Sequence, residues 1–150
     1  MDTPLRIVVA DNEPDMRHFL WRSLIHEGHR VVAIAENGRQ LVDECVLHRP
    51  DLLITEVDLP ELDGLDAIRE VCSHHTVPAI VISGSGRHDV LKRARMELVY
   101  AFLVKPIKMD DLHPAICMTM QRHSDISTLR NKIAADTLRL RQIPPDNAIR

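Results

Sequence analysis

Five short apolar runs recur along the chain, and segments with helical spacing separate them. Because each run is rich in β-branched residues and has few polar side chains, it is typical of a strand that is buried on both faces. The runs lie at 5–10, 31–35, 52–55, 79–82 and 100–104, and the helical segments lie at 14–27, 41–46, 64–72, 87–96 and from about 110 onward. This alternation predicts an α/β fold with a five-stranded, doubly wound parallel sheet and right-handed crossovers.

Length and composition narrow the class of protein further. With 150 residues, of which 45% are hydrophobic and 27% charged, the chain has the composition of a globular domain and not of a disordered tail. The net charge of -3 argues against a chain-wide nucleic-acid surface, and no apolar stretch approaches the ~20 residues that span a bilayer. Residues 1–4 lack a basic signal-peptide start, and Cys45, Cys72 and Cys117 are set far apart among apolar residues. These features predict reduced core thiols, no membrane contact and a cytoplasmic location.

Polar side chains follow the predicted strands at the points where these end. They are Asp11, Asn12, Glu13, Glu56, Asp58, Ser83 and Lys105. Because ligands of wound parallel sheets bind at the carboxyl ends of the strands, we expect these side chains to converge at one edge. Carboxylates there suit a hard divalent ion such as Mg²⁺, while a hydroxyl and an ammonium group suit an adjacent phosphoryl group.

Four motifs in this order resemble the receiver domains of two-component response regulators, which have a flavodoxin-like fold. The motifs are 7–14, 50–64, 78–84 and 102–106, and the resemblance extends over about 5–121. It places Glu56 at the phosphoacceptor position, Lys105 and Ser83 at the catalytic positions, and Ser83 and Phe102 at the switch positions, although Phe102 also suits a core side chain. It assigns the metal to Asp11, Asn12, Glu56 and the backbone carbonyl of Asp58. It also implies a histidine kinase or phosphotransfer protein and a downstream protein as partners.

Two residues depart from the receiver pattern. Glu56 stands where the family carries the phosphorylated Asp, and Asn12 stands where it carries the second residue of an acidic pair. The extra methylene moves the carboxylate by ~1.5 Å, and Mg²⁺ tolerates little distortion of its ligand geometry. Glu13 is a poor replacement for the lost carboxylate because receivers often carry Glu there anyway. We therefore expect Mg²⁺ binding to be weak or absent, and Asp58 is the rival phosphoacceptor.

The longer Glu56 side chain has a second possible role. It could reach toward Lys105 and Ser83 and imitate the phosphorylated state, which would make the chain a pseudo-receiver that signals without phosphorylation. The sequence leaves two alternatives, a conventional phosphorylatable response regulator and a flavodoxin-like binder of a phosphate-bearing ligand. It predicts a signalling module and not an enzyme.

The last helical segment is longer than a receiver domain needs. We divide the chain into a receiver domain at 1–121, a helical extension at 122–143 and a tail at 144–150, with Asp110 as the expected helix cap. Heptad columns through the extension are of mixed quality and contain Thr119, Ile126, Ile133 and Leu140 in one column and Arg122, Leu129, Asp136 and Ile143 in the other. They favour a modest parallel coiled coil, and hence a homodimer, over a solvated helix or one folded back on the domain.

The extension is similar in character to the helix that follows the receiver in antiterminator-type regulators. From Gln121 onward there are six basic and three acidic residues and no aromatic platform. This surplus is small for a nucleic-acid surface. RNA or DNA binding by this chain is therefore not expected.

Overall fold

A computed structural model describes residues 3–84, 92–93 and 98–142 of the chain. The strands are β1 (Arg6–Ala10), β2 (Arg30–Ala35), β3 (Leu52–Glu56), β4 (Ala79–Ser83) and β5 (Val99–Val104). The helices are α1 (Pro14–His26), α2 (Gly38–His48), α3 (Gly64–Cys72) and α5 (Met109–Arg141). Apart from residues 92–93, the helix predicted at 87–96 lies outside the described residues, as do Ile143 and the tail at 144–150.

The strands form one parallel sheet in the order β2-β1-β3-β4-β5. The strand order changes direction between β1 and β3, whose ends pair through Ala10 and Thr55. In sheets of this order the ligand site lies at this switch point. The predicted fold class is confirmed, and the fold brings the polar residues after β1 and β3 next to each other.

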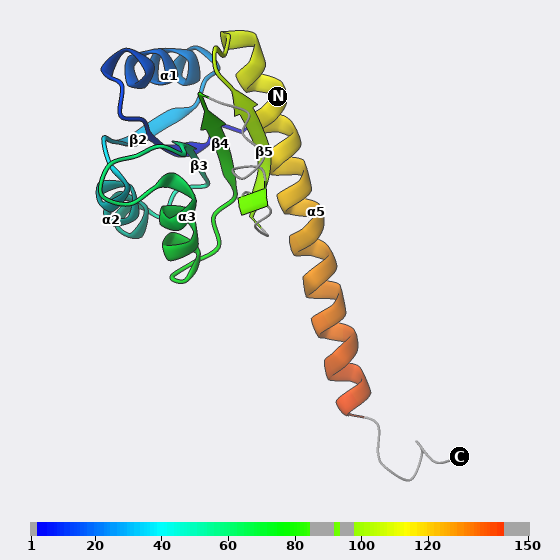
Figure 1. Ribbon diagram of the computed structural model, residues 1–150. Coiled ribbons are helices and arrows are strands. Elements are labelled where there is room, and N and C mark those ends of the chain that lie inside the picture. The colour runs from blue at the N-terminus through cyan, green and yellow to red at the C-terminus, as the bar shows by residue number, and fades with distance from the viewer. Residues whose placement is uncertain (1–2, 85–91, 94–97, 143–150) are drawn as a thin grey trace.

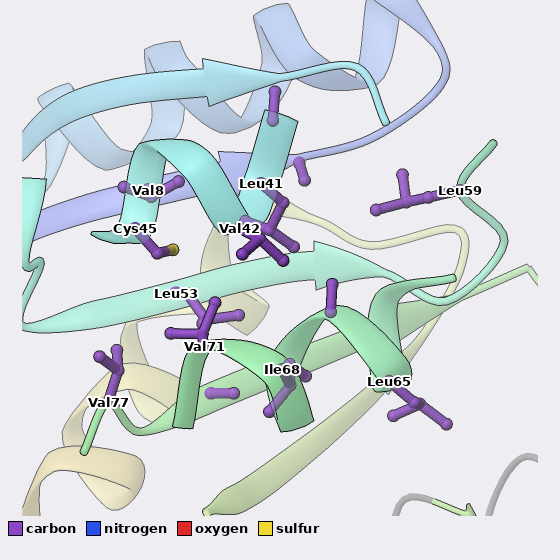
Figure 2. Close-up of a cluster of buried hydrophobic side chains, with 14 of the residues drawn as sticks. Val8, Leu41, Val42, Cys45, Leu53, Leu59, Leu65, Ile68, Val71 and Val77 are labelled. Atoms are coloured by element: carbon purple, nitrogen blue, oxygen red, sulfur yellow. The ribbon is translucent and has the colours of Figure 1, made fainter. Parts of the chain in front are cut away.

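Successive residues of the central strands pack on opposite faces of the sheet, because side chains alternate along a strand. Val8 and Leu53 face the layer formed by α2 and α3, where Leu41, Ile68 and Val71 complete a cluster of buried side chains (Figure 2). On the other face, a second cluster joins the strands to α1 and α5. Its members include Ile7, Val9, Leu20, Leu24, Ile54, Leu112 and Ile116. Burial on both faces explains why the strands appear in the sequence as nearly continuous apolar runs.

Helix α5 extends far beyond the domain (Figure 1). Its first turns pack on the sheet through Leu112 and Ile116, whereas residues from 128 to 142 are exposed. It begins at Met109 with Lys108 as its N-cap, so the predicted cap at Asp110 is wrong. The Lys108 backbone N–H donates to Asp111 Oδ2 at 2.7 Å, and this bond fixes the cap at Lys108, two residues before Asp110.

Two further expectations need correction. Cys45 is buried and Cys72 is partly buried, but Cys117 is exposed, so it is not a core thiol. Thr119, the first residue of the predicted heptad column, is buried against the domain because this part of α5 still packs on the sheet. Within 3–84, 92–93 and 98–142, no helix combines the length and apolar character needed to cross a membrane.

Candidate functional site

Lys105, directly after β5, gathers the carboxylates at the ends of the neighbouring strands. Its Nζ lies 2.7 Å from Glu56 Oε2 and 3.1 Å from Asp11 Oδ2. It also lies 3.3 Å from Oε1 of Glu13, which is mostly exposed, whereas Asp11 and Glu56 are buried. The predicted convergence of these strand-end residues is therefore present, with one ammonium group facing three carboxylates.

The Glu56 side chain is fixed at both of its oxygens. Oε2 contacts Lys105, and Oε1 accepts hydrogen bonds from the backbone N–H groups of Val57 at 3.0 Å and Asp58 at 3.3 Å. Because Glu56 is the last residue of β3, its own side chain can turn back over the start of the following loop. These contacts hold the carboxylate in one place instead of leaving it to solvent.

Electrostatics around Lys105 favour its charged form. Burial acts to lower the pKa of Lys105, but the hydrogen bond to Glu56 and the charge attraction of Glu56 and Asp11 outweigh it and hold this pKa above its ordinary value of 10.5. Lys105 therefore remains an ammonium group throughout the neutral range. The pair of buried carboxylates has a permanent counter-ion.

The loop after Glu56 packs closely on the strand end. A Cβ atom on Gly64 would lie 2.0 Å from the Glu56 carbonyl oxygen, so only glycine fits at the start of α3. The Gly64 N–H donates to the Val57 carbonyl at 2.8 Å, and Asp63 caps α3 by accepting from the Asp66 N–H at 2.9 Å. This packing explains the Asp63–Gly64 motif and fixes the backbone that carries Glu56.

Asp11 is also held by hydrogen bonds from Glu13 and Arg17, which follow it in the chain. Its Oδ1 accepts from the Glu13 N–H at 2.9 Å, and its carbonyl accepts from the Arg17 guanidinium at 2.9 Å. Its Oδ2 makes no well-directed hydrogen bond despite the 3.1 Å separation from Lys105 Nζ, so that contact is mainly Coulombic. Sequence reasoning missed the role of Arg17, whose only signal was its position in the first turn of α1, whereas Glu13 was among the strand-end residues expected at the site.

The residues that the resemblance assigns to Mg²⁺ do not fit the ion in this arrangement. Of the four carboxylate oxygens on Asp11 and Glu56, two accept backbone N–H groups and two face the Lys105 ammonium group. Asn12, an amide and not a carboxylate, is exposed at the surface.

The two residues at the switch positions lie on β4 and β5. Ser83 is buried at the end of β4, and its carbonyl accepts the Lys105 backbone N–H at 2.8 Å. Phe102 is partly buried and packs against the α2–α3 side of the core. The peptide bond between Lys105 and Pro106 is cis.

Comparisons with known proteins agree with this architecture. A family model described as the response regulator receiver domain matches residues 7–117. The transcriptional regulatory protein PdtaR of Mycobacterium tuberculosis is 36% identical over 137 residues, which cover 91% of this chain and 67% of PdtaR. The chemotaxis protein CheY of Bacillus subtilis is 33% identical over 116 residues, which cover 77% of this chain and 97% of CheY.

Solved structures show the same fold. A response regulator receiver domain protein from Clostridium thermocellum matches with a TM-score of 0.73 at 25% identity, over 81% of this chain and 98% of its own. The receiver domain of NarL from M. tuberculosis matches with a TM-score of 0.74 at 23% identity, over 80% and 98% of the two chains, and this likeness concerns the fold alone. With the sheet order, the strand-end lysine and the family match all in agreement, this chain belongs to the response regulator receiver family.

Proposed function

We propose that this chain is a pseudo-receiver of two-component signalling, in which Glu56 takes the place of a phosphorylated aspartate. The observation that carries the proposal is the 2.7 Å contact between Glu56 Oε2 and Lys105 Nζ, in a site whose carboxylates are already occupied by protein groups. The chain would transmit a state through protein contacts and would catalyse no reaction of its own.

The length of the Glu56 side chain supports this function. A phosphoryl group on an aspartate would present its oxygens beyond the end of the normal carboxylate, and Glu56 extends in that direction by one methylene, ~1.5 Å. The resulting charge-assisted hydrogen bond to Lys105 stabilises any conformation in which the two groups meet. If that conformation is the signalling one, the equilibrium favours it without a phosphodonor.

The charge of the site supports the same conclusion. With Asn12 in place of a carboxylate, the acidic residues facing Lys105 are Asp11, Glu13 and Glu56, and the first and last of these are buried. A bound Mg²⁺ would have to displace the ammonium group of Lys105 or share its two carboxylates at close range. Mg²⁺ dehydrates reluctantly and demands near-octahedral oxygen ligands, so weak or absent binding is expected.

The test of the proposal offers the protein Mg²⁺ with acetyl phosphate, and separately Mg²⁺ with beryllofluoride. We expect no covalent phosphate by intact-protein mass spectrometry and little change in the amide NMR spectrum, because the acceptor carboxylate is held by Lys105, Val57 and Asp58. Stoichiometric labelling of Glu56, or a large spectral response to beryllofluoride, would contradict the pseudo-receiver. Labelling at Asp58 would instead identify the rival acceptor.

A conventional, phosphorylatable regulator is the second candidate. Lys105, Ser83, Phe102 and the Asp63–Gly64 loop all retain the receiver pattern, and the fold places Ser83 and Lys105 at adjacent strand ends. A histidine kinase or phosphotransfer protein would then be the upstream partner. The labelling experiment separates the two candidates, because only this one requires phosphate on the protein.

Under either candidate the partners are proteins. We propose a downstream protein that recognises the surface near β5 and α5, in a cytoplasmic setting where the thiols stay reduced.

We also propose that the chain consists of a receiver domain at 1–121 and an extension at 122–143, and that the extension mediates a parallel homodimer.

The exposed part of α5 carries the apolar residues for such a dimer. With Thr119 inside the domain, the accessible seam starts at the half-buried Ile126 and continues through Leu129, Ile133 and Leu140, of which the last three are 58%, 58% and 68% exposed. Their spacing of three, four and seven residues keeps them on one face of the helix. Asp136 interrupts the seam, as the sequence predicts, so the pairing should be of moderate strength.

The double variant Leu129→Asp/Ile133→Asp should be monomeric where the unmodified chain is a dimer. Each buried aliphatic side chain contributes about 1.5–3 kcal/mol, so losing both from each helix should weaken association by well over ~100-fold. Light scattering after size-exclusion chromatography measures the change. Leu138→Asp is the matched control, because Leu138 is 57% exposed but lies off the seam. Equal effects of the two variants, or a monomeric unmodified chain, would contradict the proposed interface.

A further inference from the structure

A second group of reactive side chains lies where the end of α1 meets α5, separate from the Lys105 site. His113 Nδ1 is 3.1 Å from Oε2 of Glu27, the residue that caps the C-terminal end of α1. One turn further along α5, Cys117 Sγ is 3.6 Å from His113 Nε2 and 4.0 Å from Nδ1. A carboxylate, an imidazole and a thiol therefore follow one another in contact, as in sites that activate a cysteine nucleophile.

Cys117 also faces a pocket. A cavity of about 400 Å³ opens between the N-terminal segment, the residue before β2 and α5, and Cys117 is part of its wall. The other walls include the apolar side chains of Leu5, Ile116 and Met120, and the ring of His29, whose Nδ1 accepts the Leu5 N–H at 3.1 Å. A small molecule that binds there would lie against the sulfur of Cys117.

Cys45 and Cys72 differ from Cys117 in burial, and therefore in reactivity. Cys45 is fully buried, and burial raises its pKa to about 12; Cys72 is partly buried, and burial raises its pKa as well. Both are thus poor nucleophiles, because the thiolate is the reactive form. Only Cys117, among the three cysteines, is exposed and next to an imidazole that contacts a carboxylate.

We infer that Cys117 is a site of reversible thiol–disulfide exchange, in which it takes up one half of a small aliphatic disulfide from the adjoining pocket. The Cys117 thiol gives its proton to His113, and the thiolate attacks one sulfur of the disulfide. A bond forms between Sγ and that sulfur as the original S–S bond breaks. The departing thiolate takes the electron pair and receives the proton from His113, so Cys117 is oxidised and the released thiol is the reduced product.

Glu27 and His113 have positioning roles in this scheme. The Glu27 carboxylate holds the imidazole ring in place through its 3.1 Å contact with Nδ1, and an imidazole in contact with a cysteine sulfur favours the thiolate. Glu27 also repels a thiolate directly, but His113 lies in contact with both groups and screens this repulsion. His29 also lines the pocket, is buried, and accepts the Leu5 N–H at its Nδ1.

The experiment treats the full chain with 2-hydroxyethyl disulfide, a neutral reagent, in the presence of a chelator. Intact mass and peptide mapping should show one mercaptoethanol group on Cys117, removable by dithiothreitol, with Cys45 and Cys72 unmodified. An ordinary thiol loses about fifty-fold in thiolate fraction between pH 8.5 and pH 6.5. We expect the rate at Cys117 to fall by no more than about fivefold over that range, because contact with an imidazole favours the thiolate form of a cysteine.

Variants test the two positioning residues. His113→Asn should restore the steep pH dependence and lower the rate at pH 6.5 by at least about tenfold, and Glu27→Gln should have a smaller effect in the same direction. His48→Asn is the matched control, because it removes a similar His–Glu contact of 3.1 Å on α2, away from Cys117. The inference is overturned by a steep pH profile in the unmodified chain, by equal rates in the His113 and His48 variants, or by faster reaction at Cys45 or Cys72.

Discussion

The variant Lys105→Met should lose about 2–4 kcal/mol of unfolding free energy at pH 7, because it leaves two buried carboxylates without their counter-ion. Asp11 and Glu56 are fully or almost fully buried, and both lie within 3.1 Å of the ammonium group that the variant removes. The loss should be at or below the usual cost of breaking a buried pair, since the Lys105 side chain is 17% exposed. Urea unfolding of the variant and the unmodified protein measures this loss, provided that the two have the same dependence of unfolding free energy on urea concentration.

A matched variant and a pH series make this prediction specific. Lys132→Met removes the same charge from an exposed position on α5 and should change stability by less than ~0.5 kcal/mol. In Lys105→Met, the unpaired carboxylates should take up protons more readily on folding, so the deficit should shrink as the pH falls from 7 to 5. A deficit that does not depend on pH would show that lost packing, and not unpaired charge, is the cause.

In the unmodified protein, the contribution of Lys105 to stability should change with pH only in the alkaline range. The pKa of Lys105 is raised in the folded state above its unfolded value of 10.5, so folding favours the protonated amine. The contribution of the pair to stability is then fully present below about pH 10.5 and is lost as the pH rises through the folded value. Across the neutral range the contribution of Lys105 should therefore be constant.

The double variant Asn12→Asp/Glu56→Asp should turn a chain with background labelling into one that is phosphorylated by acetyl phosphate in a Mg²⁺-dependent way. Shortening residue 56 by one methylene withdraws its carboxylate from Lys105 by ~1.5 Å and opens space for a phosphoryl group. The aspartate at position 12 adds a second carboxylate beside Asp11 for the metal. Intact-protein mass spectrometry should show labelling that approaches one phosphate per chain and disappears with chelator.

Each single variant is a control for the other. Glu56→Asp alone should label weakly, because the metal still lacks one carboxylate, and Asn12→Asp alone should not label, because Glu56 still occupies the acceptor position. Strong labelling of Asn12→Asp alone, mapped to Glu56 and not to Asp58, would show that Glu56 accepts phosphate once a metal is present. That result would support the conventional regulator over the pseudo-receiver.

Much of the site was predictable because it depends on strand ends. In a parallel sheet all carboxyl ends meet at one edge, so Asp11, Glu56, Ser83 and Lys105 could be brought together from their positions alone. The partners of each atom could not be predicted in that way. The turn of the Glu56 side chain back to the N–H groups of Val57 and Asp58 depends on the exact path of the loop, and the contact of Arg17 with the Asp11 carbonyl depends on how α1 packs.

The same dependence on tertiary packing explains why the expectations for Asp110, Cys117 and Thr119 were wrong. Asp110 is a good capping residue by type, but the position of the chain after β5 starts α5 earlier, at Met109. Cys117 and Thr119 lie two residues apart on α5, yet one is exposed and the other buried, because only one face of that part of the helix packs on the sheet. A heptad pattern records which residues share a face but not which face the domain covers.

By itself the sequence determined the class of fold and the strand-end residues, including Asn12 and Glu56 on which the proposed function rests, because these follow from periodicity, chain order and side-chain chemistry. Only the tertiary structure decided that Glu56 meets Lys105 at 2.7 Å, and that Glu27, His113 and Cys117 come into contact. Such contacts join residues from separate elements, and their distances depend on how helices and strands pack in three dimensions.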